Sequence, residues 1–325
     1  MKRGLVIGKF MPLHAGHIAL IEFGRQHCDE LIVSMSYTPV DPINGTLRFG
    51  WIREIFQPDP GIIPAISLDD FDNNRLPTYQ RTKIWADFLK KRFPPIDLLF
   101  SSEAYGDSLA GHLGARHLPF DLTRNRIPVS ASAIRTHPFQ NWAFIPKIVR
   151  PYFVKKICFY GPESTGKSTL ARHLAEVYHT EVVPEVAREL ITSNEFSVDD
   201  IIRIGQAQTD RVKEKLKTAN QILFCDSDLI TTQIYSKKYL GVAPKILMRL
   251  EREIQYDLHF LFDIDVPWIS DGLRDLGSQR REMMNVFEAE LAERNIQPIL
   301  VRGNWEERER IVRKEIDFLL TSARK

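Results

Sequence analysis

The sequence predicts an α/β protein of two domains, each built on a mainly parallel sheet. Three observations lead to this prediction: a length of 325 residues, short apolar runs that alternate with amphipathic segments, and a break in that alternation near the middle. At roughly 150 residues per domain, this length favours two domains that each bury a core. The alternation itself is typical of parallel α/β architecture. We expect one domain over residues 1–150 and a second over residues 151–325.

The first half contains five apolar runs that predict strands, separated by helical segments. The expected strands cover residues 5–10, 31–37, 62–68, 96–102 and 119–122, and the clearest helices cover residues 17–27, 47–56 and 78–93. Near residue 138 the alternation breaks, because prolines and Trp142 interrupt any long regular element. A new strand begins at Val154, which places the domain boundary near residue 150.

The second half repeats the alternation of strands and helices. The expected strands lie near Ile157 and Val182 and over residues 222–225, 259–264 and 298–301. Residues 209–218 are rich in Lys and Glu and predict the solvated face of a helix.

The composition excludes several classes of protein. With 43% hydrophobic and 26% charged residues, the chain is typical of globular proteins and not of disordered or fibrous ones. A net charge of +2 argues against a dedicated nucleic-acid binder, although local positive groups still suit small anions. No apolar run is long enough for membrane insertion or for a signal peptide. Cys28, Cys158 and Cys225 lack zinc-site spacing and predict free thiols in a reducing cytoplasm.

A phosphate-binding loop is the clearest motif of the second half. Residues 161–169 match GxxxxGK[ST] and stand between a predicted strand and a predicted helix, which is the context that confirms this motif. Backbone N–H groups would surround the β-phosphate, Lys167 would add a charge, and the Ser168 hydroxyl would hold Mg²⁺. The loop residues expected to contact ATP are Gly161, Ser164, Thr165, Gly166, Lys167, Ser168 and Thr169.

Acidic residues after two other strands complete this predicted site. Asp226 ends the run 222–225, where a phosphate-loop protein places its second magnesium-coordinating group, and Asp228 follows. Glu185, with Arg188 three residues later, follows the strand near Val182 at the sheet edge where ligands bind. Glu185 and Asp226 are both candidates for the base that accepts a substrate hydroxyl proton, and the sequence does not choose. A helix cap and a surface ion pair are the structural alternatives.

A basic segment over residues 271–281 predicts a lid that clamps the transferring phosphate. Its candidate residues are Asp271, Arg274, Arg280 and Arg281. Trp268, just upstream, would stack on a base. A solvated charge run and a packing tryptophan are the alternatives that the sequence leaves open.

The first half carries a different candidate anion site. Gly8, Lys9 and Phe10 follow the first strand, and His14 and His17 stand at the entrance of the next helix. Histidines three residues apart share a helix face, and two imidazole donors beside a helix N-terminus suit phosphates. A metal site is the alternative for such a pair.

A second helix start near the end of this domain has similar chemistry. Ser130 and Ser132 offer hydroxyl groups at the start of a helix, and Arg135 lies one turn further in. This segment therefore predicts another phosphate-binding helix N-terminus.

Together these motifs resemble a known enzyme family. The GKFxPLHxGH opening and the VSASAIR segment are similar to the HxGH nucleotidyltransferases, whose second signature reads ISxTxIR. The phosphate loop followed by VPEVAREL, FCDSD and DGLRDLGS resembles ribosylnicotinamide kinases. Over nearly the whole chain, this order resembles the NadR-type bifunctional nicotinamide-mononucleotide adenylyltransferases and ribosylnicotinamide kinases. Ser132 replaces the usual Thr but keeps the hydroxyl, and the DNA-binding module of some members is missing, so no transcriptional role is expected.

The resemblance implies a Rossmann-like nucleotidyltransferase domain followed by a P-loop kinase domain. It implies phosphorylation of nicotinamide riboside by ATP, then adenylyl transfer from ATP to nicotinamide mononucleotide (NMN), giving NAD and pyrophosphate. Mg²⁺ is the expected cofactor in both reactions. The residues assigned to adenylyl transfer are His14, His17, Lys9 and Arg135 as catalytic groups and Gly8, Phe10, Arg48, Ser130 and Ser132 as nucleotide ligands. Trp85 is assigned to hold the nicotinamide ring, and packing of its helix against the core is the alternative.

Two other functions remain open from the sequence. A regulator that senses NAD and ATP without turnover has no reason to keep His14, His17 and Lys167 together. Cytidylyl or pantetheine-phosphate transfer would keep the chemistry of the first domain with another acceptor. No nucleic-acid partner and no membrane insertion are expected, and the sequence does not decide whether the chain forms a homo-oligomer.

Overall fold

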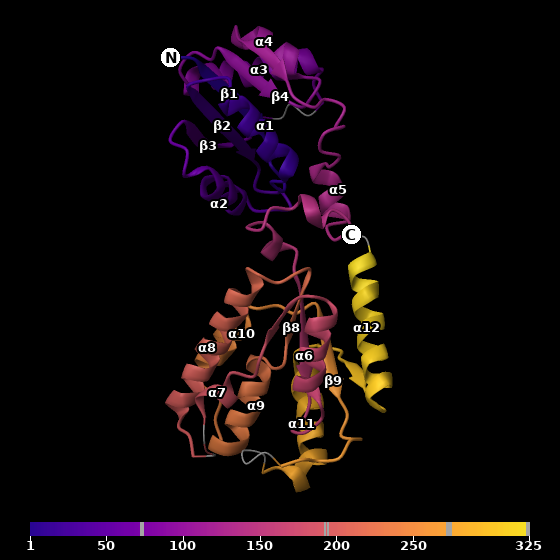
Figure 1. Cartoon of the computed structure of the whole chain (residues 1–325). Helices are drawn as coiled ribbons and strands as arrows, with labels where there is room; N and C mark the ends of the chain where they lie inside the picture. The colour runs from indigo at the N-terminus through magenta and orange to yellow at the C-terminus, as the bar shows by residue number, and fades with distance from the viewer. Residues whose placement is uncertain (72–74, 192, 194, 271–274, 323–325) are drawn as a thin grey trace. The chain divides into compact units, whose positions relative to one another are not determined.

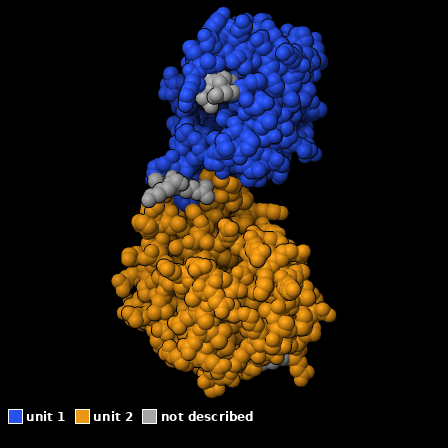
Figure 2. Space-filling view, turned by 180° about the vertical axis from the view of Figure 1, so that it is seen from behind, with its two compact units in different colours: residues 1–149, 323–325 blue, residues 150–322 orange. Residues whose placement is uncertain are grey.

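The computed structural model describes residues 1–71, 75–191, 193, 195–270 and 275–322. They form two compact units, Met1–Val149 and Arg150–Ser322, which Figure 2 shows in different colours. Each unit is an α/β fold with its own five-stranded sheet, and every strand pairing in both sheets is parallel (Figure 1). The predicted fold class is therefore confirmed.

The first unit has the sheet order β3-β2-β1-β4-β5. Its elements are β1 (Arg3–Gly8), α1 (Ala15–Arg25), β2 (Glu30–Tyr37), α2 (Gly45–Phe56), β3 (Ile62–Leu68), α3 (Thr78–Arg92), β4 (Leu98–Ser101), α4 (Gly106–Leu113), β5 (Arg116–Pro119) and α5 (Ala131–Thr136). The chain builds outward from β1 to β3 and then returns to the other side of β1 for β4. In open α/β sheets, ligands bind outside the carboxyl ends of the strands at such a switch point.

The second unit has the sheet order β10-β9-β6-β8-β7. Its elements are β6 (Lys155–Tyr160), α6 (Lys167–Val177), β7 (Glu181–Val183), α7 (Ala187–Leu190), α8 (Val198–Leu216), β8 (Ile222–Cys225), α9 (Leu229–Leu240), α10 (Lys245–Glu251), β9 (Leu258–Phe262), α11 (Arg280–Glu293), β10 (Ile299–Val301) and α12 (Trp305–Thr321). Central β6 leads into α6, so the loop between them lies at the carboxyl edge of the sheet.

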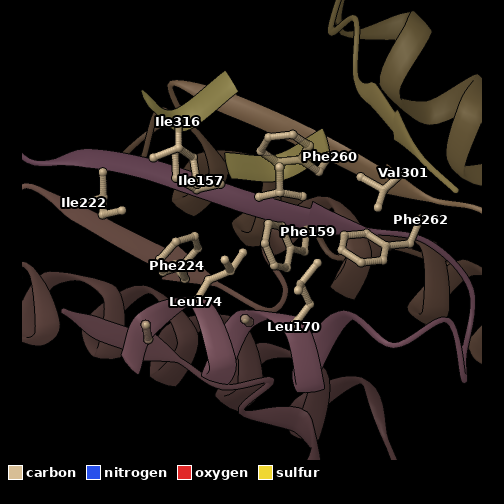
Figure 3. Close-up of a cluster of buried hydrophobic side chains, with 13 residues drawn as sticks. Ile157, Phe159, Leu170, Leu174, Ile222, Phe224, Phe260, Phe262, Val301 and Ile316 are labelled. Atoms are coloured by element: carbon tan, nitrogen blue, oxygen red, sulfur yellow. The ribbon is translucent and has the colours of Figure 1, made fainter. Parts of the chain in front are cut away.

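A phenylalanine cluster attaches this sheet to α6 (Figure 3). Phe159 of β6 lies 5.9 Å from Phe224 of β8 and 5.0 Å from Phe262 of β9, measured between ring centroids. The rings pack against Leu170 and Leu174 of α6, and all five side chains are at most 1% exposed. Strands buried on both faces are continuous apolar runs, which is why the sequence revealed them. The packed cluster fixes where the phosphate loop leaves the sheet.

The structure differs from the sequence prediction at two elements. The fifth strand covers Arg116–Pro119 instead of residues 119–122, because this edge strand is partly exposed and lacks an apolar run, whereas buried Phe120 follows it. Residues 209–216 are the end of the longer helix α8, and residues 217–218 form the turn after it. Thr209 and Val212 are buried, so that segment is not a purely solvated face.

Two other predictions, the interrupted segment and the free cysteines, are confirmed within the part of the chain that the structure describes. Between Pro138 and Tyr152 there are two short 3₁₀ helices, Trp142–Phe144 and Arg150–Tyr152, and no long element. The three cysteines are free and buried. Across the described ranges, the helices are all too short or too polar to cross a bilayer.

Candidate active sites

The histidine pair of the first unit lies where β1 delivers the chain to α1. His14 is the N-cap of α1, and its Nδ1 accepts a hydrogen bond from the Gly16 backbone N–H at 3.1 Å. Because Nδ1 is an acceptor, the neutral ring carries its proton on Nε2. The His14 and His17 rings stack with centroids 3.7 Å apart, and Phe10 contacts His17 edge-on at 4.9 Å. The three predicted side chains therefore form one cluster.

Both histidines are held in the neutral state. Burial, aided by the positive Arg124, lowers the pKa of His14 to about 4. Burial, neighbouring His14 and Arg124 together lower the pKa of His17 well below its ordinary value. At neutral pH these rings therefore act as N–H donors, and permanent positive charge must come from other groups.

Two of the predicted cations lie close to this cluster. Lys9 Nζ is 3.6 Å from an Asp41 carboxylate oxygen, with nearly half of the lysine side chain exposed. Arg135 donates to the Met11 carbonyl at 2.5 Å and to the Ser132 hydroxyl at 3.1 Å. Since Met11 belongs to the loop after β1, Arg135 joins α5 to the loop that carries the histidines.

Ser130 and Arg48 have structural partners. The Ser130 hydroxyl caps α5 by accepting from the Ala133 backbone N–H at 3.1 Å. Arg48 was expected to bind phosphate, but its side chain has 0% exposure. It donates to the Ile43 carbonyl at 2.9 Å, to the Lys9 carbonyl and to Asp41 at 2.5 Å. Arg48 therefore holds the loop that carries Lys9. A sequence motif does not distinguish an arginine with this structural role from one that binds phosphate.

Trp85 lies on α3 in a half-buried aromatic cluster. Its ring contacts Phe71 at 5.5 Å and Phe88 at 5.7 Å, both edge to face. Trp85 also packs against the core between the sheet and α3. The expectation that it holds the nicotinamide ring therefore competes with a packing role.

In the second unit, the predicted phosphate loop lies between β6 and α6, at the carboxyl edge of the sheet. Gly161 has φ +133°, and a Cβ there would lie 2.7 Å from the Phe262 carbonyl oxygen, so this position requires glycine. Lys167 donates from Nζ to the Gly161 carbonyl at 2.7 Å and to the Pro162 carbonyl at 2.8 Å. The lysine charge therefore lies within the loop, where β- and γ-phosphates bind in proteins of this kind.

Asp226 lies beside Ser168 and is suited to a cation. Burial raises the pKa of the Asp226 carboxyl, while Lys167 and a hydrogen bond from Ser168 oppose that shift. Its Oδ1 is inaccessible to solvent and has no hydrogen-bond partner among the described residues. Mg²⁺ is usually held by one or two protein oxygens together with waters and phosphates, so a hydroxyl and one carboxylate fit it. No group of three or more metal-ligating side chains occurs in the described ranges.

A cavity of about 510 Å³ extends from the phosphate loop across the carboxyl ends of β7 and β8. Glu185 and Arg188 line it and form an ion pair of 2.9 Å, so the surface-pair alternative and a position in the site are both realised. Away from the loop, the lining includes the aromatic side chains Phe196, Tyr235 and Tyr239. This cavity combines a phosphate end with an aromatic end.

Gln208 is a lining residue that no sequence motif revealed. It is 2% exposed on α8. Its side-chain oxygen accepts from the Val186 N–H at 3.0 Å, and its amide donates to the Ser227 carbonyl at 3.3 Å. Gln208 therefore ties together the loops that carry Glu185 and Asp226.

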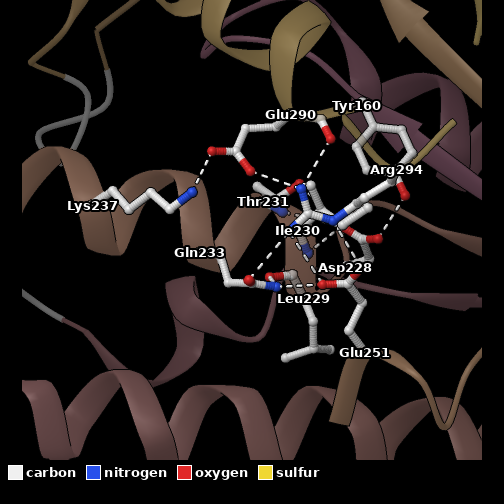
Figure 4. Close-up of polar contacts among 10 residues, drawn as sticks. All are labelled: Tyr160, Asp228, Leu229, Ile230, Thr231, Gln233, Lys237, Glu251, Glu290 and Arg294. Carbon is white, nitrogen blue, oxygen red and sulfur yellow. Dashed lines mark hydrogen bonds and ion pairs between the residues drawn. The ribbon is translucent and has the colours of Figure 1, made fainter. Parts of the chain in front are cut away.

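Asp228 is a helix cap in this structure and not a lining residue. Its carboxylate accepts from the Ile230 and Thr231 N–H groups at 2.9 and 3.1 Å and from the Tyr160 hydroxyl at 2.6 Å (Figure 4). The contacts of Asp228 are therefore those of a helix cap, which was the structural alternative for this residue. Arg294, which directly follows α11, binds Gln233 of α9, Glu251 of α10 and Glu290 of α11, and so attaches these three helices to one another (Figure 4).

The predicted lid is described in part. Arg280 donates to the Val266 carbonyl at 2.8 Å and to the Ser164 carbonyl at 3.3 Å, so it lies against the phosphate loop. Trp268 is 36% exposed and packs on Gly277, where an added Cβ would lie 2.9 Å from the indole. Arg281 is exposed. Asp271 and Arg274 lie outside the described residues.

Arg308 of α12 is a second residue that sequence motifs missed. Its side chain is buried and donates to the Thr165 carbonyl of the phosphate loop at 2.7 Å. Next to it, a mainly apolar cavity of about 320 Å³ is lined by Thr169, Phe262 and Trp305, among others.

Comparison with known proteins gives consistent matches. An AAA domain family model matches residues 156–308. The trifunctional NAD biosynthesis/regulator protein NadR of Escherichia coli (strain K12) is 32% identical over 330 residues, which cover 92% of this chain and 78% of that protein. A nicotinamide-nucleotide adenylyltransferase of Methanothrix thermoacetophila is 31% identical over 114 residues, covering 31% of this chain and 58% of that enzyme.

Two solved structures share the fold of this chain. A NadR protein in complex with NAD and AMP-PNP superposes with a TM-score of 0.80 at 22% identity, covering 100% of this chain and 97% of that one. A NadR protein in complex with NR has a TM-score of 0.77 at 24% identity, covering 97% of this chain and 94% of the other.

Proposed function

The chain belongs to the NadR family, and on that premise we propose that its two units carry out the two ATP-dependent steps of NAD salvage. The second unit, Arg150–Ser322, phosphorylates nicotinamide riboside to NMN. The first unit, Met1–Val149, transfers the adenylyl group of ATP to NMN and releases pyrophosphate. The proposal is supported by two separate clusters of side chains whose chemistry suits phosphate, each at the carboxyl edge of its own parallel sheet.

Adenylyl transfer in the first unit needs no general base, because the attacking NMN phosphate is already an anion. Catalysis rests on orientation and on stabilising charge at the α-phosphate and the leaving pyrophosphate. Neutral His14 and His17 donate N–H groups at this point, while Lys9 and Arg135 supply charge. Gly8, Phe10, Ser130 and Ser132 shape the nucleotide site.

Phosphoryl transfer in the second unit does require proton acceptance from the riboside hydroxyl. Asp226 contacts Ser168, so we assign these two to the cation. Glu185 lines the cavity, and its side chain is about one quarter exposed. We assign Glu185 as the base that accepts the proton of the riboside hydroxyl. Arg188 then orients Glu185, while Lys167 and Arg280 act on the phosphates.

Mg²⁺ would be held by Ser168 and Asp226, where it would neutralise charge on the β- and γ-phosphates. The aromatic end of the large cavity, with Tyr235 and Tyr239, accommodates the flat nicotinamide ring. The apolar cavity beside Trp305 accommodates the adenine of ATP, whereas the sequence predicts stacking of a base on Trp268.

The direct test is incubation of the protein with ATP and one acceptor at a time. Nicotinamide riboside should yield ADP and NMN, and supplied NMN should yield NAD and pyrophosphate. The acid mononucleotide, a cytidylyl acceptor and pantetheine phosphate serve as comparison acceptors for pyrophosphate release. Binding of ATP and NAD without any product would instead favour a sensor. The buried free thiols are consistent with a cytoplasmic location, which fractionation of cells would test.

A further inference from the structure

Arg124 lies in the loop after β5, beside the histidine pair of the first unit. Its guanidinium is close enough to contribute to the lowered pKa of both His14 and His17. The same loop packs on the entrance of α1, because a Cβ on Gly16 would lie 3.8 Å from Ile127 Cγ2. Two separate observations therefore place this loop at the histidine motif.

The loop is built to fix the direction of Arg124. The backbone N–H of Arg124 donates to the Asp121 carbonyl at 2.9 Å. The Asp121 carboxylate accepts from the backbone N–H groups of Arg126 and Ile127 at 3.1 and 3.0 Å. Arg124 has φ +53°, a conformation that costs energy for a residue with a side chain. Strain of this kind persists where surrounding hydrogen bonds impose it, as the Asp121 carboxylate does here.

The guanidinium of Arg124 has an exchangeable partner. It forms an ion pair of 3.0 Å with Glu103, and the two side chains are 46% and 53% exposed. Exposed ion pairs of this kind contribute about 0–1 kcal/mol to the stability of a protein, so this pair is easily broken. Glu103 lies in the loop after β4, the strand that borders the switch point of the sheet. A polyphosphate bound there would offer the planar guanidinium two oxygens, which is its preferred geometry.

The neighbouring groups leave a need for such a charge. The histidines are neutral, Lys9 lies near Asp41, and Arg135 donates to the Met11 carbonyl. We propose that Arg124 is a catalytic residue of the first unit. Its guanidinium separates from the Glu103 carboxylate and binds the β- and γ-phosphates of ATP. This inference rests on the proposed adenylyl transfer.

The reaction explains why a positive charge is needed beside the β- and γ-phosphates of ATP. An oxygen of the NMN phosphate forms a bond to the α-phosphorus, and the bond from the α-phosphorus to the oxygen that bridges to the β-phosphorus breaks. The electron pair leaves with pyrophosphate, which gains negative charge, and no proton has to move. A fixed guanidinium at the leaving group stabilises the transition state more than the bound ATP.

The test compares three variants of the full chain. In Arg124→Gln, kcat for NAD synthesis should fall by roughly 10²-fold, as for other lost charge-stabilising donors, while the KM for NMN changes little. Inhibition by added pyrophosphate should weaken in the same variant. Arg126→Gln is the matched control, because Arg126 lies in the same loop but over the Phe120 ring at 5.8 Å. It should remain close to wild type.

Glu103→Gln separates catalysis from a structural ion pair. Without the carboxylate, Arg124 is released to phosphate, so the KM for ATP should fall while NAD synthesis persists. If the ion pair were structural, Glu103→Gln and Arg124→Gln would lose activity to a similar extent, and that result would overturn the inference. Riboside kinase activity and thermal melting show in each variant that the protein is folded.

The outcomes also separate this inference from the proposed function. If the wild-type protein makes no NAD from ATP and NMN, adenylyl transfer itself is wrong. If the wild type makes NAD and Arg124→Gln matches it in kcat and in pyrophosphate inhibition, the function stands and the role of Arg124 is wrong.

Discussion

Arg308 allows a quantitative test of how the second unit holds its phosphate loop. Its guanidinium donates to the carbonyls of Gly303 at 2.8 Å, Thr165 at 2.7 Å and Asp263 at 3.3 Å, and it pairs with the Asp265 carboxylate. One side chain thus joins the phosphate loop to the loops after β9 and β10. Arg308→Met keeps an apolar stem over Phe262 but removes every donor.

The expected cost follows from these contacts. A buried acceptor left without its donor costs about 1–3 kcal/mol, and breaking a buried ion pair costs roughly 3–5 kcal/mol. Because Asp265 is 35% exposed, water recovers part of that loss. We expect the free energy of unfolding to fall by about 3–4 kcal/mol, at the lower end of the range for a buried pair. At about 2–4 °C per kcal/mol, the melting temperature should fall by roughly 6–16 °C.

Calorimetry together with both enzyme assays measures the effect. Arg313→Met is the control on the same helix, since Arg313 is 47% exposed and pairs with Glu309 at 3.2 Å. Such a pair contributes at most about 1 kcal/mol. Below its melting temperature, Arg308→Met should also lose riboside kinase activity while NAD synthesis from supplied NMN continues. Equal, small shifts in both variants, with full kinase activity, would refute the reasoning.

Three further predictions concern the first unit. His17→Ala should lower NAD synthesis by roughly 10²–10³-fold, and wild-type turnover in a folded variant would contradict its role as a donor. Trp85→Ala should raise the KM for NMN more than the KM for ATP, whereas equal changes with a lowered melting temperature would favour a packing role. His14 has a folded pKa of about 4, below its ordinary 6.5, so the unfolded chain binds the extra proton and stability falls as pH drops through that window. At pH 5 this loss is about 2 kcal/mol, and His14→Asn, which can still cap α1, should not show it in denaturant titrations at pH 7 and 5. Identical pH dependence in both proteins would contradict the buried neutral state.

Contiguous features of both units could be predicted from the sequence. Central strands are buried on both faces, so they are unbroken apolar runs, and the phosphate loop needs glycines and a lysine at fixed spacing. The histidine cluster also comes from one short segment. In these cases, local sequence and local structure carry the same information.

Contacts between distant segments could not be predicted. Arg308 donates a hydrogen bond to a carbonyl 143 residues away. Gln208, on α8, binds one loop that precedes this helix and another that follows it. Neither contact has a periodic pattern. Arg48 and Asp228 show the converse: each residue type suits a site, but burial and neighbouring partners give it a structural role. The edge strand β5 was misplaced because partial exposure removes the apolar signal.

The central claim is that two independent sites catalyse successive reactions, and one pair of substitutions tests it most directly. Lys167→Ala removes the charge within the phosphate loop, and His14→Ala removes a donor from the histidine cluster. Both activities are measured on both variants, with thermal melts to exclude unfolding. The account predicts that Lys167→Ala loses riboside phosphorylation but still makes NAD from supplied NMN, and that His14→Ala shows the reverse. Loss of both reactions from either substitution in a folded protein would contradict it.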